Sequence, residues 1–294
     1  MGGRAGTIFS PRNDASFLHI RTCSTTSAPQ LRTSRSGGEA AMVGDKVYLV
    51  GGFDFDVLSC VHALSFRPQH TALAPESPSA GEKNRSTGVS APAETSMLRL
   101  RPANVWKPMP RLKTARTRFG MCSLYGMLWV FGGADSEGEV LSSVEVFNPR
   151  TKTWMPGAQA MPTARQGVGV VALGGLIYVM GGADDEGLPL DIVEVYDPVK
   201  GTWREEQPMR QKRERFGISV LDSCIFVAGG FGEVGQPVAD VEVFDSSLPP
   251  GAVYLCADYT TPHAQLSRFS HPSRSLSFGE QAGLSSTRRR CAGR

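Results

Sequence analysis

The chain has 294 residues, with 33 Gly, 20 Pro and a formal net charge of +3, and its apolar runs are too short for a membrane-spanning helix. The positive charge lies in the flanks, because residues 41–66 and 102–246 together carry 15 basic and 21 acidic residues. We therefore expect no membrane partner and no nucleic-acid partner, since nucleic-acid binding would require the opposite distribution of charge.

Four short apolar runs, each ending in a Gly-Gly pair, follow one another at 46–52, 127–133, 176–182 and 224–230. An arginine lies 16 residues before the first glycine of each pair, at Arg35, Arg116, Arg165 and Arg213. An aromatic residue lies 15 residues after it, at Phe66, Phe147, Tyr196 and Phe244. A tryptophan precedes the last three pairs, at Trp106, Trp154 and Trp203. These features in register predict four copies of one structural unit.

Each copy is expected to form four short strands. In the third copy, residues 167–173, 176–180 and 192–197 and the segment around Trp203 are rich in β-branched and aromatic residues. Gly174 and Gly175 suit a tight hairpin turn between the first two strands. Gly181 and Gly182 suit a close backbone approach where a Cβ atom would clash. No segment keeps helical apolar spacing for ten residues.

The order R-x-x-x-G, apolar strand, I-Y-V-x-G-G, V-E-V-Y-D-P and tryptophan resembles the Kelch repeat over residues 31–247, apart from an insertion. The resemblance implies an all-β fold, a Kelch-type β-propeller with four recognisable four-stranded blades in a partial or open ring. The glycine pairs and tryptophans are then structural positions of the repeat: Gly132, Gly133, Gly181, Gly182, Gly229, Gly230, Trp106, Trp154 and Trp203.

The repeat spacing divides the chain. The expected blades are 31–66 joined to 102–112, then 113–161, 162–209 and 210–247. The insertion at 67–101 is rich in Pro, Ser, Ala and Thr, and we expect it to be disordered. Residues 1–30 form a disordered or partly ordered flank, and residues 248–294 form a low-complexity tail.

The resemblance also raises the question of ring closure, because Kelch propellers usually have five to seven blades. The fourth copy lacks its tryptophan, and an incomplete ring leaves exposed strand edges. Either the flanks complete the ring, or the chain is a fragment or a truncated gene model, which we favour. For the outer strand of the fourth blade we favour residues 252–256 over 17–20, in an open assembly.

The loops after strands two and four of each blade should open on one face, which combines acidic and basic residues. In Kelch adaptors that capture acidic motifs, the second arginine of R-x-R-[apolar]-G contacts ligand carboxylates. Arg118 and Arg215 match that pattern and are candidate partner-binding residues. Arg116, Arg165 and Arg213 are candidates too, although their recurrence also fits a structural pairing between blades. Glu145, Glu194 and Glu242 recur and are expected to be structural ion-pair partners.

The predicted function is protein–protein interaction through this face, with another protein as partner, through an acidic or phosphorylated motif. One alternative is the substrate-recognition component of a cullin-type ubiquitin ligase. A second is a propeller enzyme with metal or small-molecule chemistry. No histidine cluster, phosphate loop or nucleophile motif supports the enzyme, so we expect no catalytic residues, no metal and no cofactor. None of the six cysteines forms a C-x-x-C pair or lies at zinc-ligand spacing from a histidine. This pattern indicates reduced thiols in an intracellular protein, and we expect it in the cytoplasm.

Overall fold

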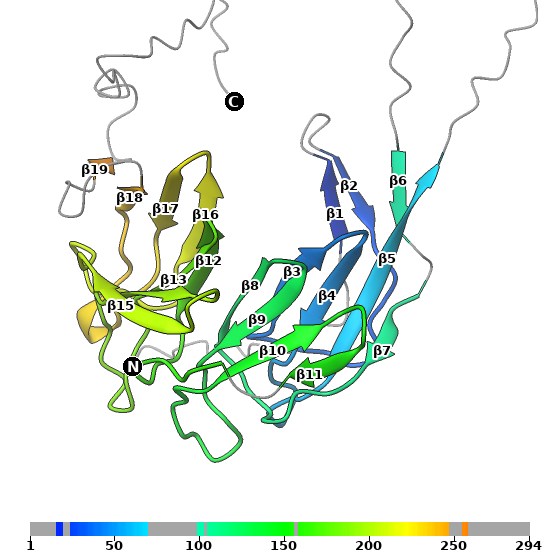
Figure 1. Ribbon diagram of the computed structural model, residues 1–294, viewed down its shortest axis with the longest axis horizontal. Helices are drawn as coiled ribbons and strands as arrows, with labels where there is room; N and C mark the ends of the chain where they lie inside the picture. The colour runs from blue at the N-terminus through cyan, green and yellow to red at the C-terminus, as the bar shows by residue number, and fades with distance from the viewer. Residues whose placement is uncertain are drawn as a thin grey trace, which may run out of the picture.

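The fold was examined in a computed structural model, which describes residues 16–19, 24–69, 99–102, 105–155, 158–246 and 255–257. The described chain forms four antiparallel sheets of the expected kind and one separate hairpin. The blades follow one another along an arc, with blade 1 and blade 4 at its two ends (Figure 1). In the part of the chain that is described, no helix is long and apolar enough to cross a membrane.

Blades 2, 3 and 4 are each built from four consecutive strands that pair in chain order, whereas the third strand of blade 1 pairs with both strands that follow it. The first strands are β3 (Glu39–Val43), β8 (Gly120–Leu124), β12 (Gly169–Leu173) and β16 (Gly217–Leu221). The second strands are β4 (Lys46–Val50), β9 (Met127–Phe131), β13 (Leu176–Met180) and β17 (Cys224–Ala228). The third are β5 (Val61–Gln69), β10 (Val144–Asn148), β14 (Val193–Asp197) and β18 (Val241–Asp245). The outer strands are β7 (Lys107–Met109), β11 (Thr153–Met155), β15 (Thr202–Glu206) and β19 (Leu255–Ala257). The prediction of four-stranded blades is confirmed for blades 2, 3 and 4, whereas the sheet of blade 1 has a fifth strand, β6 (Arg99–Pro102).

Tight turns join the first two strands of each blade, as the sequence predicted. Gly174 and Gly175 have φ angles of 60° and 82°, and they separate the paired residues Leu173 and Leu176. Two consecutive residues with positive φ give the type I′ geometry that suits the twist of a two-residue hairpin. Tyr125 and Gly126 make the same turn in blade 2, with φ angles of 52° and 73°.

Apolar side chains fill the spaces between neighbouring blades. The second strands are the most buried elements, and Leu128, Val130, Ile177, Val179 and Ile225 have almost no exposed surface. The three repeat tryptophans lie at the edge of these cores, and each indole Nε1–H donates to a backbone carbonyl at least 44 residues earlier in the chain. The donors and acceptors are Trp154 to Pro110 at 3.0 Å, Trp203 to Gln159 at 3.2 Å and Trp106 to Pro29 at 2.8 Å. The repeat tryptophans therefore have the structural role that was predicted.

The pairing register corrects the sequence alignment of blade 1. Phe147 pairs with Leu128 in blade 2, and the residue in the same place of blade 1 is Leu64, which pairs with Val47. Phe66 was therefore the wrong equivalent. The connection between β4 and β5 is two residues shorter than the one between β9 and β10, so counting from the glycine pair overshoots the strand.

Strands also extend into segments that were predicted to be disordered. β5 continues to Gln69, and its end pairs with β6 (Arg99–Pro102), so both ends of the predicted insertion 67–101 are ordered. Residues 70–98, the centre of that insertion, lie outside the described residues. The fourth blade likewise extends beyond residue 247, because β19 lies within the predicted tail.

The closure of blade 4 follows the prediction. Its outer strand, β19, pairs Leu255 with Val243 and comes from the segment just downstream of the repeats. The alternative segment instead forms β1 (Ser16–His19), which pairs with β2 (Ser24–Ser27). β2 lies just before Arg35 in the chain, and the outer strand β7 lies just before Arg116 in the same way. The hairpin therefore has the position in the sequence that the two outer strands of a preceding blade would have.

Candidate functional site

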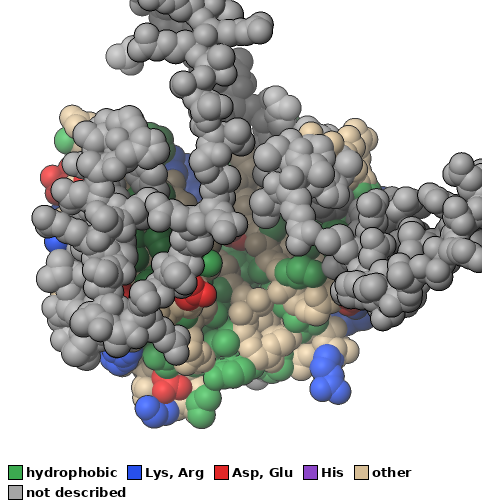
Figure 2. Space-filling view, turned by 90° about the horizontal axis from the view of Figure 1, so that it is seen from above, with side chains coloured by type: hydrophobic (Ala, Val, Ile, Leu, Met, Phe, Trp, Pro, Cys, Tyr) green, Lys and Arg blue, Asp and Glu red, His purple; other side chains and the backbone are tan. Residues whose placement is uncertain are grey.

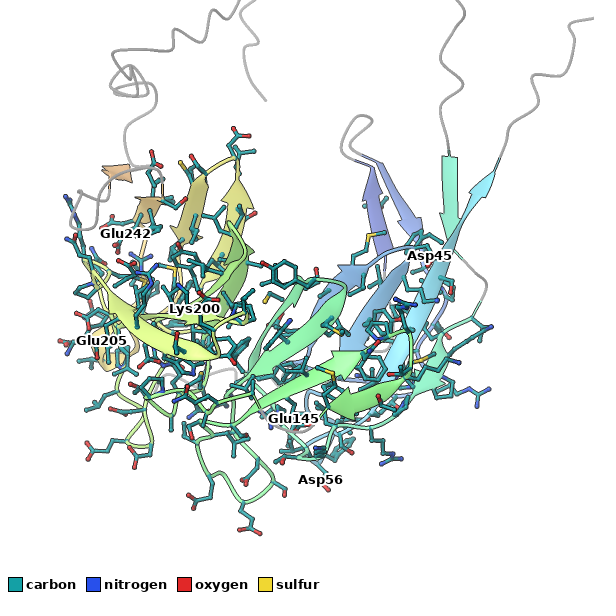
Figure 3. All side chains as sticks on the ribbon, viewed as in Figure 1. Asp45, Asp56, Glu145, Lys200, Glu205 and Glu242 are labelled. Atoms are coloured by element: carbon teal, nitrogen blue, oxygen red, sulfur yellow. The ribbon has the colours of Figure 1, made fainter. Side chains whose placement is uncertain are left out.

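The arginines of the repeat lie inside the blades. Arg116, Arg165 and Arg213 are fully buried, and each pairs with the glutamate of the third strand in its own blade. The ion pairs are Arg116 with Glu145 at 2.8 Å, Arg165 with Glu194 at 2.7 Å and Arg213 with Glu242 at 2.6 Å. Figure 3 labels Glu145 and Glu242 on β10 and β18.

These buried arginines also hold the backbone of the glycine pairs. Arg116 Nη1 donates to the Gly132 carbonyl at 2.9 Å, and Arg165 Nη1 donates to the Gly181 carbonyl at 3.2 Å. Burial lowers the pKa of Arg116 and of Arg165, and the partner glutamate raises it. The prediction that Arg116, Arg165 and Arg213 bind a partner is wrong, because their guanidinium groups have no access to the surface. The three glutamates are structural ion-pair partners as expected, but each ion pair lies within one blade, so the expected pairing between blades is wrong.

The second residue after each repeat arginine lies at the centre of the arc. These residues are Gly37, Arg118, Gly167 and Arg215, and all four have φ angles between 53° and 61°. They form a chain of backbone hydrogen bonds from blade to blade: Arg118 N to Gly37 O at 3.0 Å, Gly167 N to Arg118 O at 2.6 Å and Arg215 N to Gly167 O at 2.9 Å. Among these described residues no bond returns from blade 4 to blade 1. The ring is open.

A cavity of about 530 Å³ lies over this chain of hydrogen bonds, and all four blades contribute to it. Phe53, Phe119, Val168 and Phe216 provide its apolar walls, and Arg118, Arg215 and Glu39 provide its charged groups. Hydrophobic side chains are visible between the two ends of the arc when the molecule is seen from its open side (Figure 2). The cavity thus combines apolar walls with several polar and charged groups, as ligand sites do.

The loops of the two predicted sets do share one face. Isolated backbone bridges join the segment before the first strand to the segment after the second strand, for example Thr117 to Ala134 and Glu214 to Phe231. The pairing of Lys212 with Glu233 at 3.3 Å links a basic and an acidic loop on this face. Among the described residues, no group of three His, Cys, Asp or Glu side chains could hold a metal ion.

Arg118 and Arg215 lie in the same cavity although they belong to different blades. Arg118 Nη1 donates to Gln166 Oε1 at 3.2 Å, whereas Arg215 Nε pairs with Glu214 Oε2 at 3.3 Å. Partial burial lowers the pKa of Arg118, the positive charge of Arg215 lowers it further, and Glu214 opposes both effects. The two cations therefore repel each other, and Arg118 lacks a carboxylate partner within the described chain. An anion placed between them would relieve that repulsion.

Glu39 is a site residue that the sequence analysis missed. It pairs with Val50 at the place where the other first strands have Gly120, Gly169 and Gly217. A Cβ atom on Gly120 would lie 2.2 Å from Val170, so no side chain fits there, whereas the Glu39 side chain lines the cavity. Glu39 is solvent-exposed at the cavity, yet the protein atoms around its carboxyl group raise its pKa to about 7 by desolvation. The missing glycine in the first copy of R-x-x-x-G was the available signal.

Comparison with known proteins agrees with this architecture. A family model described as the KLHDC2/KLHL20/DRC7 Kelch-repeats domain matches residues 96–248, which is about half of the chain. The chain belongs to this Kelch-repeat family. The matched residues run from the outer strand of blade 1 to the third strand of blade 4, and the structure adds the rest of blade 1 to the same architecture.

Two known proteins are similar to this chain, one in sequence and one in structure. An F-box/kelch-repeat protein of Arabidopsis thaliana is 41% identical over 51 residues, which make up 17% of this chain and 14% of that protein. The chain thus matches only a small part of that relative. The solved structure of YjhT superposes with a TM-score of 0.58 at 16% identity, over 80% of this chain and 69% of that one. At this identity the likeness shows the shared propeller fold.

Proposed function

We propose that the Kelch domain is a protein-binding module that holds a carboxylate-bearing segment of its partner in the cavity between the blades. The observation that carries this proposal is the pair of cavity arginines, of which Arg118 has no carboxylate partner among the described residues. Charge-assisted hydrogen bonds from arginine to carboxylate are stronger than neutral ones, and the apolar walls reduce their exposure to water. A phosphorylated segment offers the same anionic chemistry. We propose that no reaction is catalysed there.

The proposed ligand is an acidic peptide in extended form. The cavity volume of about 530 Å³ is that of a small-ligand pocket, so it accommodates a short peptide segment rather than a folded surface. Phe53, Phe119 and Phe216 offer aromatic surface beside the arginines, so we expect apolar residues next to the acidic one in the ligand. The acidic loops around the rim would disfavour ligands whose charge pattern does not match.

Exchanging both cavity arginines for alanine should weaken binding of an acidic peptide about 100-fold, since each charge-assisted contact contributes about 1.5 kcal/mol or more. The probe would be a carboxylate-bearing peptide selected from a display library on the wild-type domain, with affinity measured by fluorescence anisotropy. A matched control is Arg111→Ala/Arg210→Ala, which removes the same charge from exposed positions outside the cavity lining. Equal binding by Arg118→Ala/Arg215→Ala and the control would exclude the cavity as the site.

Binding of the same peptide should strengthen as the pH falls from about 8 to about 6. The pKa of Glu39 is raised to about 7, so its carboxylate is charged above that pH and repels an anionic ligand, and it becomes neutral below. Carboxylates of the peptide itself stay charged over this range. Glu39→Gln should bind at pH 8 as tightly as the wild type does at pH 6. A wild-type affinity independent of pH would show that Glu39 does not face the ligand.

A second candidate function is substrate recognition for a cullin-type ubiquitin ligase in the cytoplasm. It is favoured by the relative whose name joins an F-box to kelch repeats. In this role the cavity would select the substrate, and the ligase contact would lie elsewhere. Co-purification of a cullin with the tagged chain would support it. Recovery of the acidic partner without any ligase subunit would support the protein-binding function and argue against the role in a ubiquitin ligase.

A further inference from the structure

Blade 1 departs from the other blades around its repeat arginine. Arg35 is nine-tenths buried, and its Nη1 donates to the Gly51 carbonyl at 2.9 Å, as in the other blades. Its Nη2 lies 3.2 Å from Cys60 Sγ and 3.0 Å from His62 Nδ1. Within the described residues no carboxylate forms an ion pair with Arg35, although all three equivalent arginines have one.

Two substitutions in the repeat account for this difference. His62 pairs with Leu49 at the register where Glu145 pairs with Val130, so an imidazole replaces the glutamate. The Cys60 carbonyl accepts from Gly51 N as the Ser143 carbonyl accepts from Gly132 N, so a thiol replaces the serine hydroxyl. In blade 2 that hydroxyl accepts a hydrogen bond from Arg116 Nη2 at 3.0 Å. The thiol of Cys60 takes the same contact from Arg35.

His62 does not replace the missing negative charge. Burial lowers the pKa of His62, and the positive charges of Arg35 and Arg32 lower it further, so the ring is neutral at physiological pH. A guanidinium only donates, so Nδ1 of the neutral ring accepts from Arg35. A buried cation without an anion is unfavourable, and the one group in this cluster that can become an anion is the thiol of Cys60.

We propose that Cys60 is a thiol modification site that a hydroperoxide oxidises, with the guanidinium group of Arg35 held 3.2 Å from the reacting sulfur. The sulfur attacks one peroxide oxygen, so an S–O bond forms as the O–O bond breaks. The sulfur is oxidised by two electrons to a sulfenic acid, and the peroxide is reduced to water or an alcohol, which takes the proton of the thiol. Susceptibility to this step increases with thiolate character and exposure, and Cys60 is only half-buried.

The chain contains two internal comparators. Cys122 is buried in the apolar core, and burial raises the pKa of its thiol well above the usual range. Cys224 is half-buried like Cys60, but burial raises the pKa of its thiol, and the nearby carboxylate of Asp245 raises it further. Cys224 therefore controls for exposure without a neighbouring guanidinium.

The test treats the full chain with dilute hydrogen peroxide, traps sulfenic acid with dimedone and quantifies each cysteine by peptide mass spectrometry. Cys60 should be labelled at least about tenfold more than Cys122 and Cys224, because a guanidinium group contacts only the sulfur of Cys60 among these three, and the pKa of the other two thiols is raised. If Cys60 in the folded wild type is labelled no more than Cys224, the proposal is overturned. This outcome does not depend on whether any variant folds.

Two variants of one position test the role of the arginine. His62→Glu restores the carboxylate of the other blades, so the guanidinium pairs with it, and labelling of Cys60 should fall about fivefold or more. His62→Gln is the matched control of similar size without charge, and it should label like the wild type. Equal labelling of Cys60 in the two variants would show that Arg35 does not control the thiol. Thermal unfolding of both variants checks that the fold is kept.

Discussion

Replacing Arg165 with methionine should lower the free energy of unfolding by about 3–5 kcal/mol, because it leaves the buried Glu194 carboxylate without its cation. The pair is 2.7 Å long, and both side chains are almost fully buried. Thr163 Oγ1 also donates to Glu194 Oε1 at 2.7 Å, and one such hydrogen bond cannot replace the lost charge. Urea denaturation followed by circular dichroism measures the change.

Two further variants separate charge from packing in this experiment. Arg150→Met removes an exposed arginine from a turn and should change the unfolding free energy by less than about 0.5 kcal/mol. Arg165→Met/Glu194→Leu removes both charges and should recover more than half of the loss, since a buried ion pair is costly to break but not to replace. A loss for Arg165→Met as small as that for Arg150→Met would contradict the structural role assigned to the repeat arginine.

Gly181→Ala should destabilise the domain by about 4 kcal/mol, the sum of left-handed backbone strain and overpacking. Gly181 has a φ angle of 55°, and its Cβ would lie 2.6 Å from the Arg213 carbonyl oxygen and 2.8 Å from the Phe216 ring. That carbonyl belongs to the backbone of the next blade, so it cannot move without displacing the inter-blade contact. Chemical denaturation of the purified variant gives the unfolding free energy.

Gly174→Ala is the matched control for this substitution. Gly174 has a φ angle of 60°, and a Cβ atom there would meet nothing within 4 Å. Gly174→Ala should therefore lower the free energy of unfolding by only about 1–2 kcal/mol, from backbone strain alone. Similar losses in the two variants would mean that the glycine pair is required for its backbone angles alone, and not for the close approach of the next blade.

The sequence predicted those parts of the fold that every copy repeats. The hairpin at Gly174 and Gly175 and the burial of the second strands follow from local turn preference and apolar content, which need no knowledge of neighbouring blades. The register of blade 1 was misjudged at Phe66 because loop length is not fixed by the repeat. Spacing along the chain reports strand positions only where the connecting loops are equally long.

The candidate site was harder to predict because four blades build it together. Arg118 and Arg215 were identified by a motif, but their convergence in one cavity depends on the curvature of the arc. Arg116, Arg165 and Arg213 showed the limit of reasoning from charge, since exposed and buried arginines look alike in a sequence. Glu39 and His62 became meaningful only when the register showed which glycine and which glutamate they replace.

The open chain of hydrogen bonds at the centre of the arc makes the domain a one-dimensional array, in which each blade is stabilised mainly by its nearest neighbours. In such an array the terminal units separate first, and among the described blades blade 1 and blade 4 are those that contact a single neighbouring blade. A ligand that touches Glu39 in blade 1, Arg118 in blade 2 and Arg215 in blade 4 spans both ends at once. Occupying the cavity would therefore couple the two ends, and recognition of a partner would raise the cooperativity of the whole domain.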